Sequence, residues 1–336
     1  MIVVHQINPN RVTWFEQIFL NGLFNSPVCY AYRCEAYPVY HLPVIHELQV
    51  LQSLLVTGNI MKPNVSVILP YFNGKEFVKH AIDSVLSQSY SNIELIIIDD
   101  GSISQIDTTY LKDLLDSYLD PRLIYFYTTN SGLAKTRNFG VSHSGAPYIA
   151  FIDQDDYWNG DKLHRQMKAL QENPEAQFVF TDCALFGETN ESSPHPLRRR
   201  FNSGFIPDTY VKMLRSNFVP CSSVLFSRQF AQKIGDSNPN FVAVPDYEYF
   251  LRIAESCEFF YLNEVLTHIR LHPRNTSKQE MRLYLECIDV LIGRNLPGLR
   301  HKVMASRQFC KMIFFVVCLW TRKIVSNNVQ NTGLRT

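Results

Sequence analysis

The chain has 336 residues, of which 46% are hydrophobic and 19% are charged, and its formal net charge is +1 at pH 7. At about 150 residues per domain, this length corresponds to two domains or to one α/β domain with additional segments. The hydrophobic content excludes a disordered acidic chain, and the near-zero charge argues against a broad basic face for nucleic acid. The eight cysteines are scattered without a C-x-x-C pair, as expected for reduced thiols in a cytoplasmic protein.

The positive charge is concentrated at the C-terminus. No acidic residue follows Asp289, whereas eight basic residues do, so a mildly acidic body carries a basic tail. Residues 309–320 of this tail form an apolar block, flanked by basic residues, that is too short to span a bilayer. The pattern predicts a basic, apolar helical tail over 278–336 that docks on an anionic membrane surface. Packing of this helix on the body or on a second copy is the alternative.

The predicted elements begin at residue 61. Residues 1–60 show no sustained period and receive no assignment; we expect them to be dispensable, with Met61 as an alternative start. From there on, short β-branched runs alternate with segments whose apolar residues recur every three to four positions, as in strands alternating with amphipathic helices. The expected strands are 65–69, 95–98, 123–127 and 148–152, and the expected helices are 77–86, 111–119 and 133–141. This order predicts a parallel sheet of right-handed β-α-β units.

Ligands of such sheets bind beyond the carboxyl ends of the strands, so the residues after each apolar run are informative. Pro70 is expected to end the first strand. The residues at the four strand ends are Pro70–Asn73, Asp99–Asp100, Asn130–Gly132 and Asp153–Asp156. Five carboxylates are therefore expected to converge on one edge of one sheet.

A cluster of carboxylates at strand ends is costly unless a cation or hydrogen-bond donors compensate it. Asp153, Asp155 and Asp156 offer only hard oxygen ligands, which suit Mg²⁺ or Mn²⁺ bound together with the oxygens of a diphosphate. The pattern therefore predicts a metal-bound nucleoside diphosphate. The alternative is that these aspartates are turn residues and helix N-caps, since Asp156 and Asp161 precede a helical segment.

Three further side chains favour a nucleotide at this edge. Phe72 can stack on a base, and Asp99 can accept a hydrogen bond from a base N–H. Arg137 lies one helical turn after Asn130–Gly132, where it can meet a phosphate or the base. Each has a structural alternative in core packing, turn closure or a surface ion pair, but together they predict a nucleotide pocket.

Five ordered motifs resemble those of the family 2 inverting glycosyltransferases of the GT-A fold. They are VSVILPYFN at 65–73, AIDSVLSQ at 81–88, IIDDGS at 97–102, NSG at 130–132 with TRN at 136–138, and FIDQDD at 151–156. The resemblance covers residues 64 to about 277. It implies a Rossmann-like nucleotide-binding half over 61–156 and an acceptor half over 157–277, fused in one mostly parallel sheet flanked by helices. It also implies a nucleotide-sugar donor and a divalent metal, Mg²⁺ or Mn²⁺.

The resemblance assigns roles to individual residues of the donor site. Phe72 and Asp99 would contact the base, and Arg137 would support the nucleotide. The family usually has Tyr-Asn where this chain has Phe72-Asn73. Stacking is therefore kept while a hydroxyl is lost, and the identity of the base stays open.

The other residues of these motifs complete the implied site. Pro70, Asn73 and Asp100 would line the nucleotide. Asp155 would lie near the ribose, and Asp156 would reach the metal, with Asp155 as the second metal candidate.

Inverting transfer is a single displacement at the anomeric carbon, so an acceptor hydroxyl must lose its proton as it attacks. Asp246 resembles the family's catalytic base, which is the second residue of a Glu-Asp pair at the start of a helix. Pro245 replaces the Glu here, and proline fits a helix start. An N-cap aspartate is the structural alternative, and Glu248 is the second candidate for the base.

Two further stretches belong to the acceptor half. His268, Arg270, His272 and Ser277 resemble a family segment that closes over the diphosphate, and His272 is a candidate contact to metal or phosphate, with a structural histidine as the alternative. The polar insertion between Phe186 and Phe205, which contains three consecutive arginines, is expected to be a mobile acceptor-side loop.

The sequence thus predicts a cytoplasmic inverting glycosyltransferase, peripheral on the inner face of the membrane, that acts on a saccharide or lipid-linked acceptor and binds no nucleic acid. A nucleotidyltransferase is the enzymatic alternative, but it would show a Gly-rich loop with a nearby lysine where Phe72-Asn73 stands. A dehydrogenase would need G-x-G-x-x-G after the first strand. A non-catalytic nucleotide-sugar-binding protein would have lost Asp156 or Asp246, and both are present.

Overall fold

The computed structural model describes residues 2–4, 62–103, 105–187, 193–194, 201–275 and 280–293. Four strands of the first half pair in parallel in the order β4-β3-β2-β5. These strands are β2 (Val65–Tyr71), β3 (Ile93–Asp100), β4 (Leu123–Thr128) and β5 (Tyr148–Phe151). The helices between them are α3 (Val78–Leu86), α4 (Gln105–Tyr118) and α5 (Leu133–Ser142). The predicted alternation of strands and helices is confirmed.

The second half extends the same sheet. Its longer strands are β7 (Phe178–Gly187) and β11 (Phe260–Leu271), which pair in parallel. The short strands are β6 (Tyr157–Trp158), β8 (Ser193–Pro194), β9 (Gly204–Phe205) and β10 (Leu225–Ser227). Strand β10 runs antiparallel to both β5 and β7 and so joins the two halves. Within the described residues the strand order is β1-β4-β3-β2-β5-β10-β7-β11-β6, with β1 at Ile2–Val4, β8 beside β7 and β9 beside β11.

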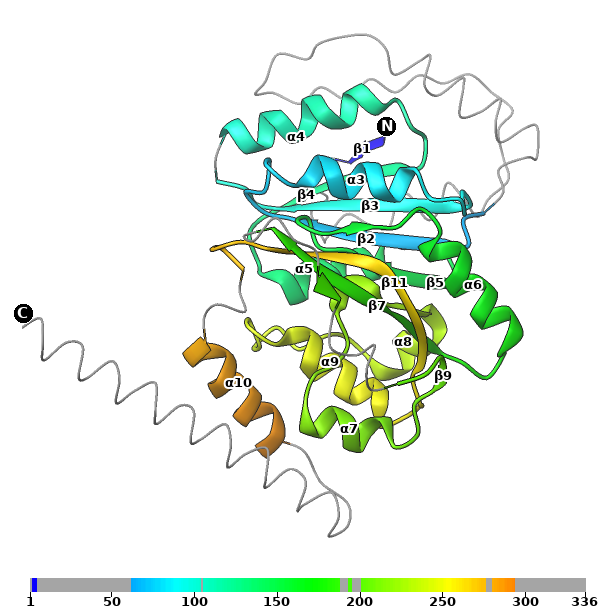
Figure 1. Cartoon of the computed structure of the whole chain (residues 1–336). Helices are drawn as coiled ribbons and strands as arrows, with labels where there is room; N and C mark the ends of the chain where they lie inside the picture. Colours follow the sequence, from blue (N-terminus) through cyan, green and yellow to red (C-terminus); the bar gives the residue numbers. More distant parts are fainter. Residues whose placement is uncertain are drawn as a thin grey trace, which may run out of the picture. The chain divides into compact units, whose positions relative to one another are not determined.

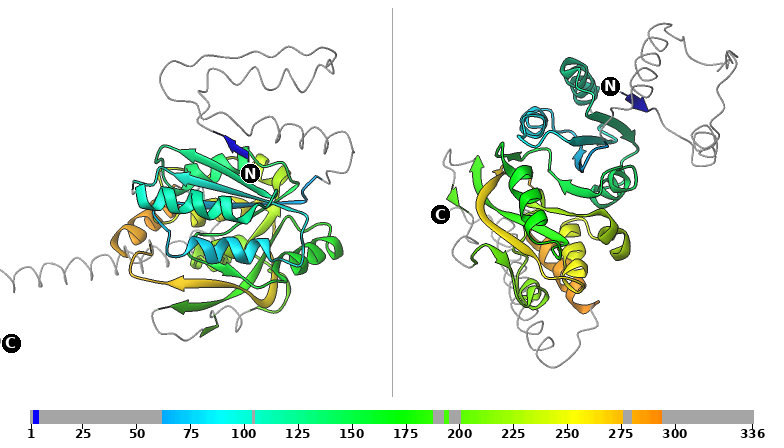
Figure 2. Two further views of the ribbon diagram at one scale, coloured as in Figure 1. Left: turned by 90° about the horizontal axis from the view of Figure 1, so that it is seen from above. Right: turned by 90° about the vertical axis from the view of Figure 1, so that its right-hand side faces the viewer.

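The remaining helical elements belong to the second half. They are α6 (Lys162–Glu172), α7 (Thr209–Arg215), the 3₁₀ turn η3 (Cys221–Ser223), α8 (Arg228–Ile234), α9 (Pro245–Ala254) and α10 (Glu280–Ile292). Helices α5, α7, α8, α9 and α10 contribute to the core on one face of the sheet, and α3, α4 and α6 contribute to the core on the other. Figures 1 and 2 show this layered arrangement. The predicted mixed α/β sheet flanked by helices is confirmed.

Strand β2 continues through Pro70 to Tyr71, so the expectation that Pro70 stops the first strand after residue 69 is wrong by two residues. Its pairing with β5 reaches only to Ile68 opposite Phe151, whereas its pairing with β3 continues to Tyr71. Beyond Ile68, the side of β2 that faces β5 therefore has no paired strand for its backbone groups to bond to. A residue without a backbone N–H is tolerated there.

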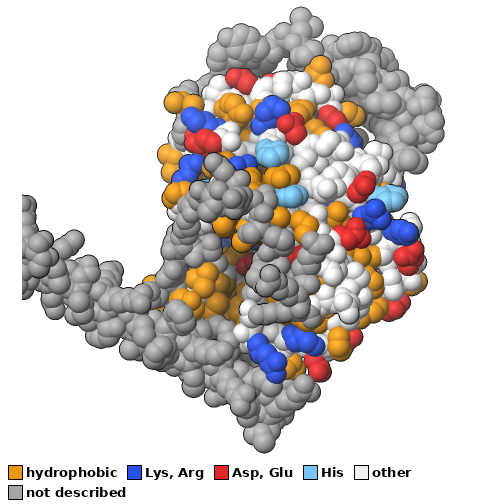
Figure 3. Space-filling model, viewed as in Figure 1, with side chains coloured by type: hydrophobic (Ala, Val, Ile, Leu, Met, Phe, Trp, Pro, Cys, Tyr) orange, Lys and Arg blue, Asp and Glu red, His pale blue; other side chains and the backbone are white. Residues whose placement is uncertain are grey.

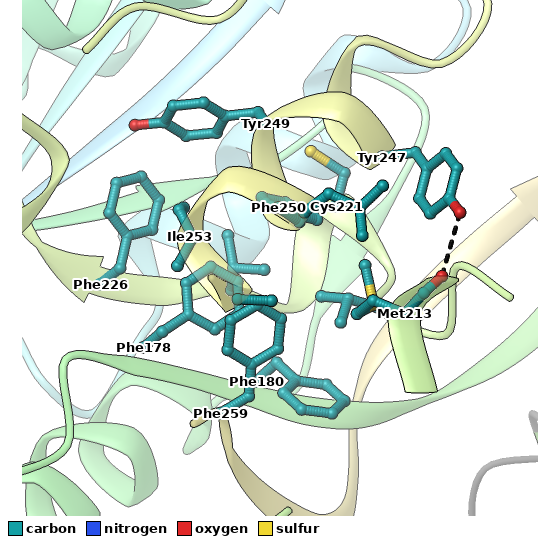
Figure 4. Packing of buried hydrophobic residues seen from close by; sticks show 14 of the residues in the cluster. Phe178, Phe180, Met213, Cys221, Phe226, Tyr247, Tyr249, Phe250, Ile253 and Phe259 are labelled. Carbon is teal, nitrogen blue, oxygen red and sulfur yellow. Dashed lines mark hydrogen bonds between the residues drawn. The ribbon is translucent and has the colours of Figure 1, made fainter. Parts of the chain in front are cut away.

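The alternation of side chains along β2 separates the two cores. Ile68 faces the cluster shared with α9, which we call the α9-side core, whereas Val67 and Leu69 face the cluster shared with α3. Aromatic rings dominate the α9-side core (Figure 4). Phe250 of α9 packs edge-on against Phe178 of β7, with ring centroids 5.3 Å apart. These contacts fix α9 against the sheet.

Helix α10, which the sequence assigns to the tail, packs on the α9-side core. Cys287, Val290 and Leu291 are buried members of that cluster. The N-terminal segment beyond β1, the three arginines of the insertion, Ser277 and the apolar block at 309–320 lie outside the described residues. Among the helices that the structure describes, none is both long enough and apolar enough to cross a bilayer.

The close approach of α5 to the sheet depends on Gly140. A Cβ at this position would lie 2.5 Å from Cγ2 of Ile68 and 3.0 Å from Cδ1 of Ile98. We therefore expect Gly140→Ala to lower the free energy of unfolding by about 1–3 kcal/mol through overpacking. Urea denaturation measures the effect, and Gly145→Ala is the control because its Cβ would make only an ordinary contact, 3.7 Å from Glu94. Equal midpoints for the two variants would contradict the packing argument.

Candidate active site

The carboxyl end of β2 presents an exposed ring on a fixed backbone. Phe72 is 38% exposed, while its N–H donates to Oε1 of Gln154 at 2.9 Å and its carbonyl accepts from Nε2 of Gln154 at 3.2 Å. Asn73 has a φ of 47°, and its N–H donates to Oγ of Ser102 at 3.0 Å. The predicted stacking residue is thus held by the loops that follow β3 and β5, and its base contact stays a prediction.

The two aspartates at the end of β3 have different surroundings. Asp99 is fully buried; its Oδ1 accepts from the N–H of Ser102 at 2.9 Å, and among the described residues its Oδ2 has no hydrogen-bond partner. Burial raises the pKa of this carboxyl. The hydroxyl of Tyr125 lies close to this carboxylate. A buried acceptor oxygen with no geometric hydrogen bond of its own is a suitable contact for the N–H of a nucleobase.

Asp100 instead accepts hydrogen bonds from backbone N–H groups. Its Oδ1 accepts from the N–H of Ser131 at 2.8 Å, and its Oδ2 accepts from the N–H of Gly132 at 2.9 Å. Gly132 is the N-cap of α5 and has a φ of 89°, which favours glycine. In this arrangement Asp100 fixes the loop that leads into α5 and thereby positions Arg137.

Arg137 connects α5 to the end of β5. Its side chain is buried, and Nη2 lies 2.5 Å from Oδ1 of Asp153. The guanidinium carbon also lies 5.5 Å from the ring centroid of Phe151, and Nε has no partner among the described residues. The predicted phosphate residue is therefore next to the aspartate-rich loop and retains one unused donor.

The carboxylates of Asp155 and Asp156 are held by segments that are distant in the sequence. Asp156 accepts from Oγ of Ser222 at 2.5 Å and from the N–H of Arg270 at 3.0 Å. Asp155 accepts from Nε2 of His272 at 2.8 Å. Burial and the neighbouring carboxylates raise the pKa of both groups. The two predicted metal candidates thus lie together in a crowded anionic site.

Strand β11 and the residue that follows it supply two of the residues expected to close over the diphosphate. Arg270 donates from Nε to the carbonyl of Asp155 at 3.0 Å, and the ring of His272 stacks on Phe77 at 4.8 Å. His268 lies instead against Tyr157, with ring centroids 4.3 Å apart. Arg270 and His272 therefore bond to the aspartate-rich loop, as does Asn275, whose Nδ2 donates to Oδ2 of Asp155 at 3.3 Å, whereas His268 does not face it.

Sequence patterns do not identify Ser222. Its hydroxyl donates to Asp156, and it accepts from the N–H of Asp153 at 3.0 Å. A serine on a short 3₁₀ turn, 66 positions away from Asp156, carries no motif of its own. Its contribution follows only from the way η3 packs against β5 and β7.

The residues at the edge fit a divalent cation that shares its ligands with a diphosphate. Among the described residues, no three His, Cys, Asp or Glu side chains converge as a metal cage. Mg²⁺ and Mn²⁺ need only one or two carboxylates when phosphate oxygens and water complete the shell. The raised pKa values of Asp155 and Asp156, caused partly by mutual repulsion, also indicate an excess of negative charge that a cation would relieve.

Asp246 lies in the first turn of α9, where Pro245 is the preceding residue. Asn217 Nδ2 donates to its Oδ2 at 3.4 Å. Burial raises the pKa of Asp246, and the nearby Arg137 opposes this shift. Glu248 is engaged elsewhere, because its carboxylate pairs with Arg252 at 2.9 Å.

A cavity of about 350 Å³ joins Asp246 to Arg137. Its walls come from α5, α8 and α9, together with η3 and β5. The polar groups that line it include Asn138, Ser142 and Gln232. On the face of the molecule shown in Figure 3, the acidic and basic side chains of the described residues are interspersed.

The sheet and its aspartate-rich edge define a glycosyltransferase of the GT-A fold. Solved structures with this architecture include residues 1–349 of TarS from S. aureus, with a TM-score of 0.58 at 14% identity over 75% of this chain and 72% of that one. Another is the mannosyltransferase PcManGT from Pyrobaculum calidifontis in complex with GDP-Man and Mn²⁺, with a TM-score of 0.56 at 16% identity over 74% and 70%. At these identities the likeness concerns the fold.

Residues 66–235 match the family described as glycosyl transferase family 2, and the chain belongs to this family. The putative teichuronic acid biosynthesis glycosyltransferase TuaG of Bacillus subtilis is 30% identical over 66% of this chain and 84% of its own length. An uncharacterised glycosyltransferase of Rickettsia prowazekii is 28% identical over 70% and 72%. The predicted family and the predicted enzyme class, a glycosyltransferase, are confirmed.

We expect Asp246→Asn to make the protein more stable than the parent at pH 7, and this advantage to shrink toward pH 4. The pKa of the Asp246 carboxyl group is higher in the folded than in the unfolded chain. As the pH rises, the unfolded chain therefore loses the carboxyl proton first, and the parent loses stability between the unfolded-state and the folded-state pKa. The amide does not ionise and avoids this loss. Chemical denaturation at several pH values provides the measurement.

The control for this experiment is Asp113→Asn, which removes an exposed carboxylate from α4. This variant should keep the pH dependence of the parent. An Asp246→Asn curve parallel to that of the parent at all pH values would contradict the argument.

Proposed function

We propose that this glycosyltransferase transfers a sugar with inversion from a nucleoside diphosphate sugar to an acceptor hydroxyl, with Asp246 as the base. One observation carries the proposal: Asp246 and Arg137 line the same cavity, and Arg137 is paired with Asp153 of the aspartate-rich loop. A single guanidinium thus connects the candidate base to the candidate donor site. A single displacement needs the base and the donor within reach of the same acceptor hydroxyl.

In the proposed reaction, the acceptor hydroxyl loses its proton to Asp246 while its oxygen forms the new bond to the anomeric carbon. The bond from that carbon to the diphosphate breaks, and the diphosphate leaves with the electron pair. Burial strengthens Asp246 as a base because it raises the pKa of the carboxyl above its ordinary value.

The donor would lie along the edge formed by the ends of β2, β3 and β5. Phe72 would stack on the base, and Oδ2 of Asp99 would accept from it. Arg137, His272 and Arg270 supply positive or hydrogen-bonding groups near the diphosphate. A bound Mg²⁺ or Mn²⁺, held by Asp155 and Asp156, would neutralise the charge of the leaving group.

The acceptor is proposed to enter the cavity between α5, α8 and α9. Its amides and hydroxyls, with Tyr249 and Phe250 on the same wall, suit a saccharide, which presents hydroxyls and apolar ring faces. The related TuaG carries a name from teichuronic acid biosynthesis, which favours a polysaccharide or lipid-linked acceptor. We also propose a cytoplasmic protein whose basic tail meets an anionic membrane surface through the part that follows residue 293, which lies outside the described residues.

We expect Asp156→Ala to abolish turnover and most metal-dependent donor binding, because it removes the proposed ligand that compensates the diphosphate. Calorimetry with UDP-GlcNAc and GDP-Man, each with and without Mn²⁺, measures donor affinity. These two donors are chosen because solved relatives of the same fold contain them. The control is Asp161→Ala, which removes an exposed N-cap aspartate that makes no side-chain cap hydrogen bond. Equal donor affinities for Asp156→Ala and the parent would refute the metal assignment.

We expect Asp246→Asn to lower turnover about 100-fold or more, because it keeps the shape of the side chain but removes the proton acceptor. Donor binding should stay nearly unchanged. Glu248→Gln is the matched control, since Glu248 pairs with Arg252, and it should turn over like the parent. The reverse pattern, with a damaging Glu248→Gln and a harmless Asp246→Asn, would move the base to Glu248.

A further inference from the structure

The backbone just before α9 is hydrogen-bonded to a carboxylate from another helix. Oε2 of Glu286, in α10, accepts from the backbone N–H groups of Val242, Ala243 and Val244 at 2.8, 2.7 and 3.2 Å. Val244 is the N-cap of α9. Three successive amides that converge on one anion fix the chain immediately before Pro245 and Asp246.

Glu286 is itself held in place. Its side chain is 11% exposed, and its Oε1 accepts from Nε of Arg282 at 2.8 Å. The neighbouring residues Cys287 and Val290 anchor α10 in the α9-side core. A buried carboxylate without donors would be costly, and here three amides and one guanidinium compensate it.

The three amides that Glu286 holds immediately precede the first turn of α9. Glu286 accepts from the N–H groups of residues 242–244, and Asp246 follows two residues after Val244. Ser237, on the chain that leads to this point, exchanges two hydrogen bonds with Asn138 of α5, at 2.8 and 2.9 Å. The direction in which Asp246 enters the cavity thus depends on a segment tied at both ends.

We propose that Glu286 is a positioning residue for glycosyl transfer, which acts by holding residues 242–244 so that α9 presents Asp246 to the acceptor. This inference rests on the proposed function of Asp246. It assigns to α10 a part in the reaction, although α10 supplies no group that touches a substrate. Loss of the carboxylate frees three amides to bond to water and lets the segment before Pro245 move.

The test compares Glu286→Gln and Glu286→Ala in the full chain with the matched variant Asp289→Asn, which changes an exposed carboxylate one turn further along α10. The donor is the one of UDP-GlcNAc and GDP-Man that the parent turns over. Because small displacements of a reacting group cost up to about 100-fold, kcat should fall about 10- to 100-fold in Glu286→Ala and less in Glu286→Gln. Donor affinity should stay at the parent's value, and Asp289→Asn should match the parent throughout.

A double-mutant cycle separates positioning from general stability. If Glu286 acts through Asp246, then adding Glu286→Gln to Asp246→Asn causes little further loss of kcat. If the two residues act independently, the loss of kcat in the double variant is the product of the losses in the two single variants. Multiplying effects, or a loss of kcat that only follows the unfolded fraction in thermal unfolding, would overturn the inference. Should Glu286→Ala not fold, Glu286→Gln alone decides. Its amide has a single acceptor oxygen, which cannot serve both Arg282 and the three backbone N–H groups, so it weakens the hold on 242–244 while keeping the shape of the side chain. A harmless Asp246→Asn would overturn the proposed base itself, whereas a damaging Asp246→Asn with a harmless Glu286→Gln overturns only the role of Glu286.

Discussion

The crowding of three carboxylates at the end of β5 is the constraint on which this structure depends. Asp153, Asp155 and Asp156 lie within four residues, and burial and mutual repulsion raise the pKa of the last two. Such a group is tolerated only if donors or cations surround it. Arg137 is the buried cation on Asp153; the other donors come from further along the chain.

These donors tie the two halves of the sheet together. Arg137 comes from α5 and Ser222 from η3. Arg270 comes from β11, and His272 directly follows that strand. Strand β10, which follows η3, pairs antiparallel with both β5 and β7, and this pairing brings the second half against the first. The aspartate-rich loop is therefore compensated only when the whole sheet is assembled, so the proposed donor site depends on the domain rather than on one motif.

The sequence is informative where the chemistry is local. Strand and helix periods predict β2 to β5 and α3 to α5, because each element buries a face that its own sequence defines. The residues at the strand ends are also predictable, since the topology of a parallel sheet brings them to one edge. Ser222 and Glu286 escape such reasoning, because their partners lie 66 and more than 40 positions away and neither residue belongs to a motif. The end of β2 is mispredicted for a related reason. The strand continues through Pro70 because its pairing with β5 already ends at Ile68, and this register cannot be read from the sequence.

The start of α9 shows how the two kinds of information combine. The family usually has a glutamate before the aspartate, and here Pro245 stands in its place. A proline at the first position of a helix donates no N–H, and the preceding amides are satisfied by Glu286 from outside the motif. The negative charge near this helix end is therefore supplied by α10 rather than by the adjacent residue. Burial raises the pKa of Asp246, so the ionised form of its carboxyl group is destabilised. The fixed backbone at 242–244 keeps this carboxylate in one orientation. Groups in unfavourable environments persist in folded proteins where their surroundings hold them firmly.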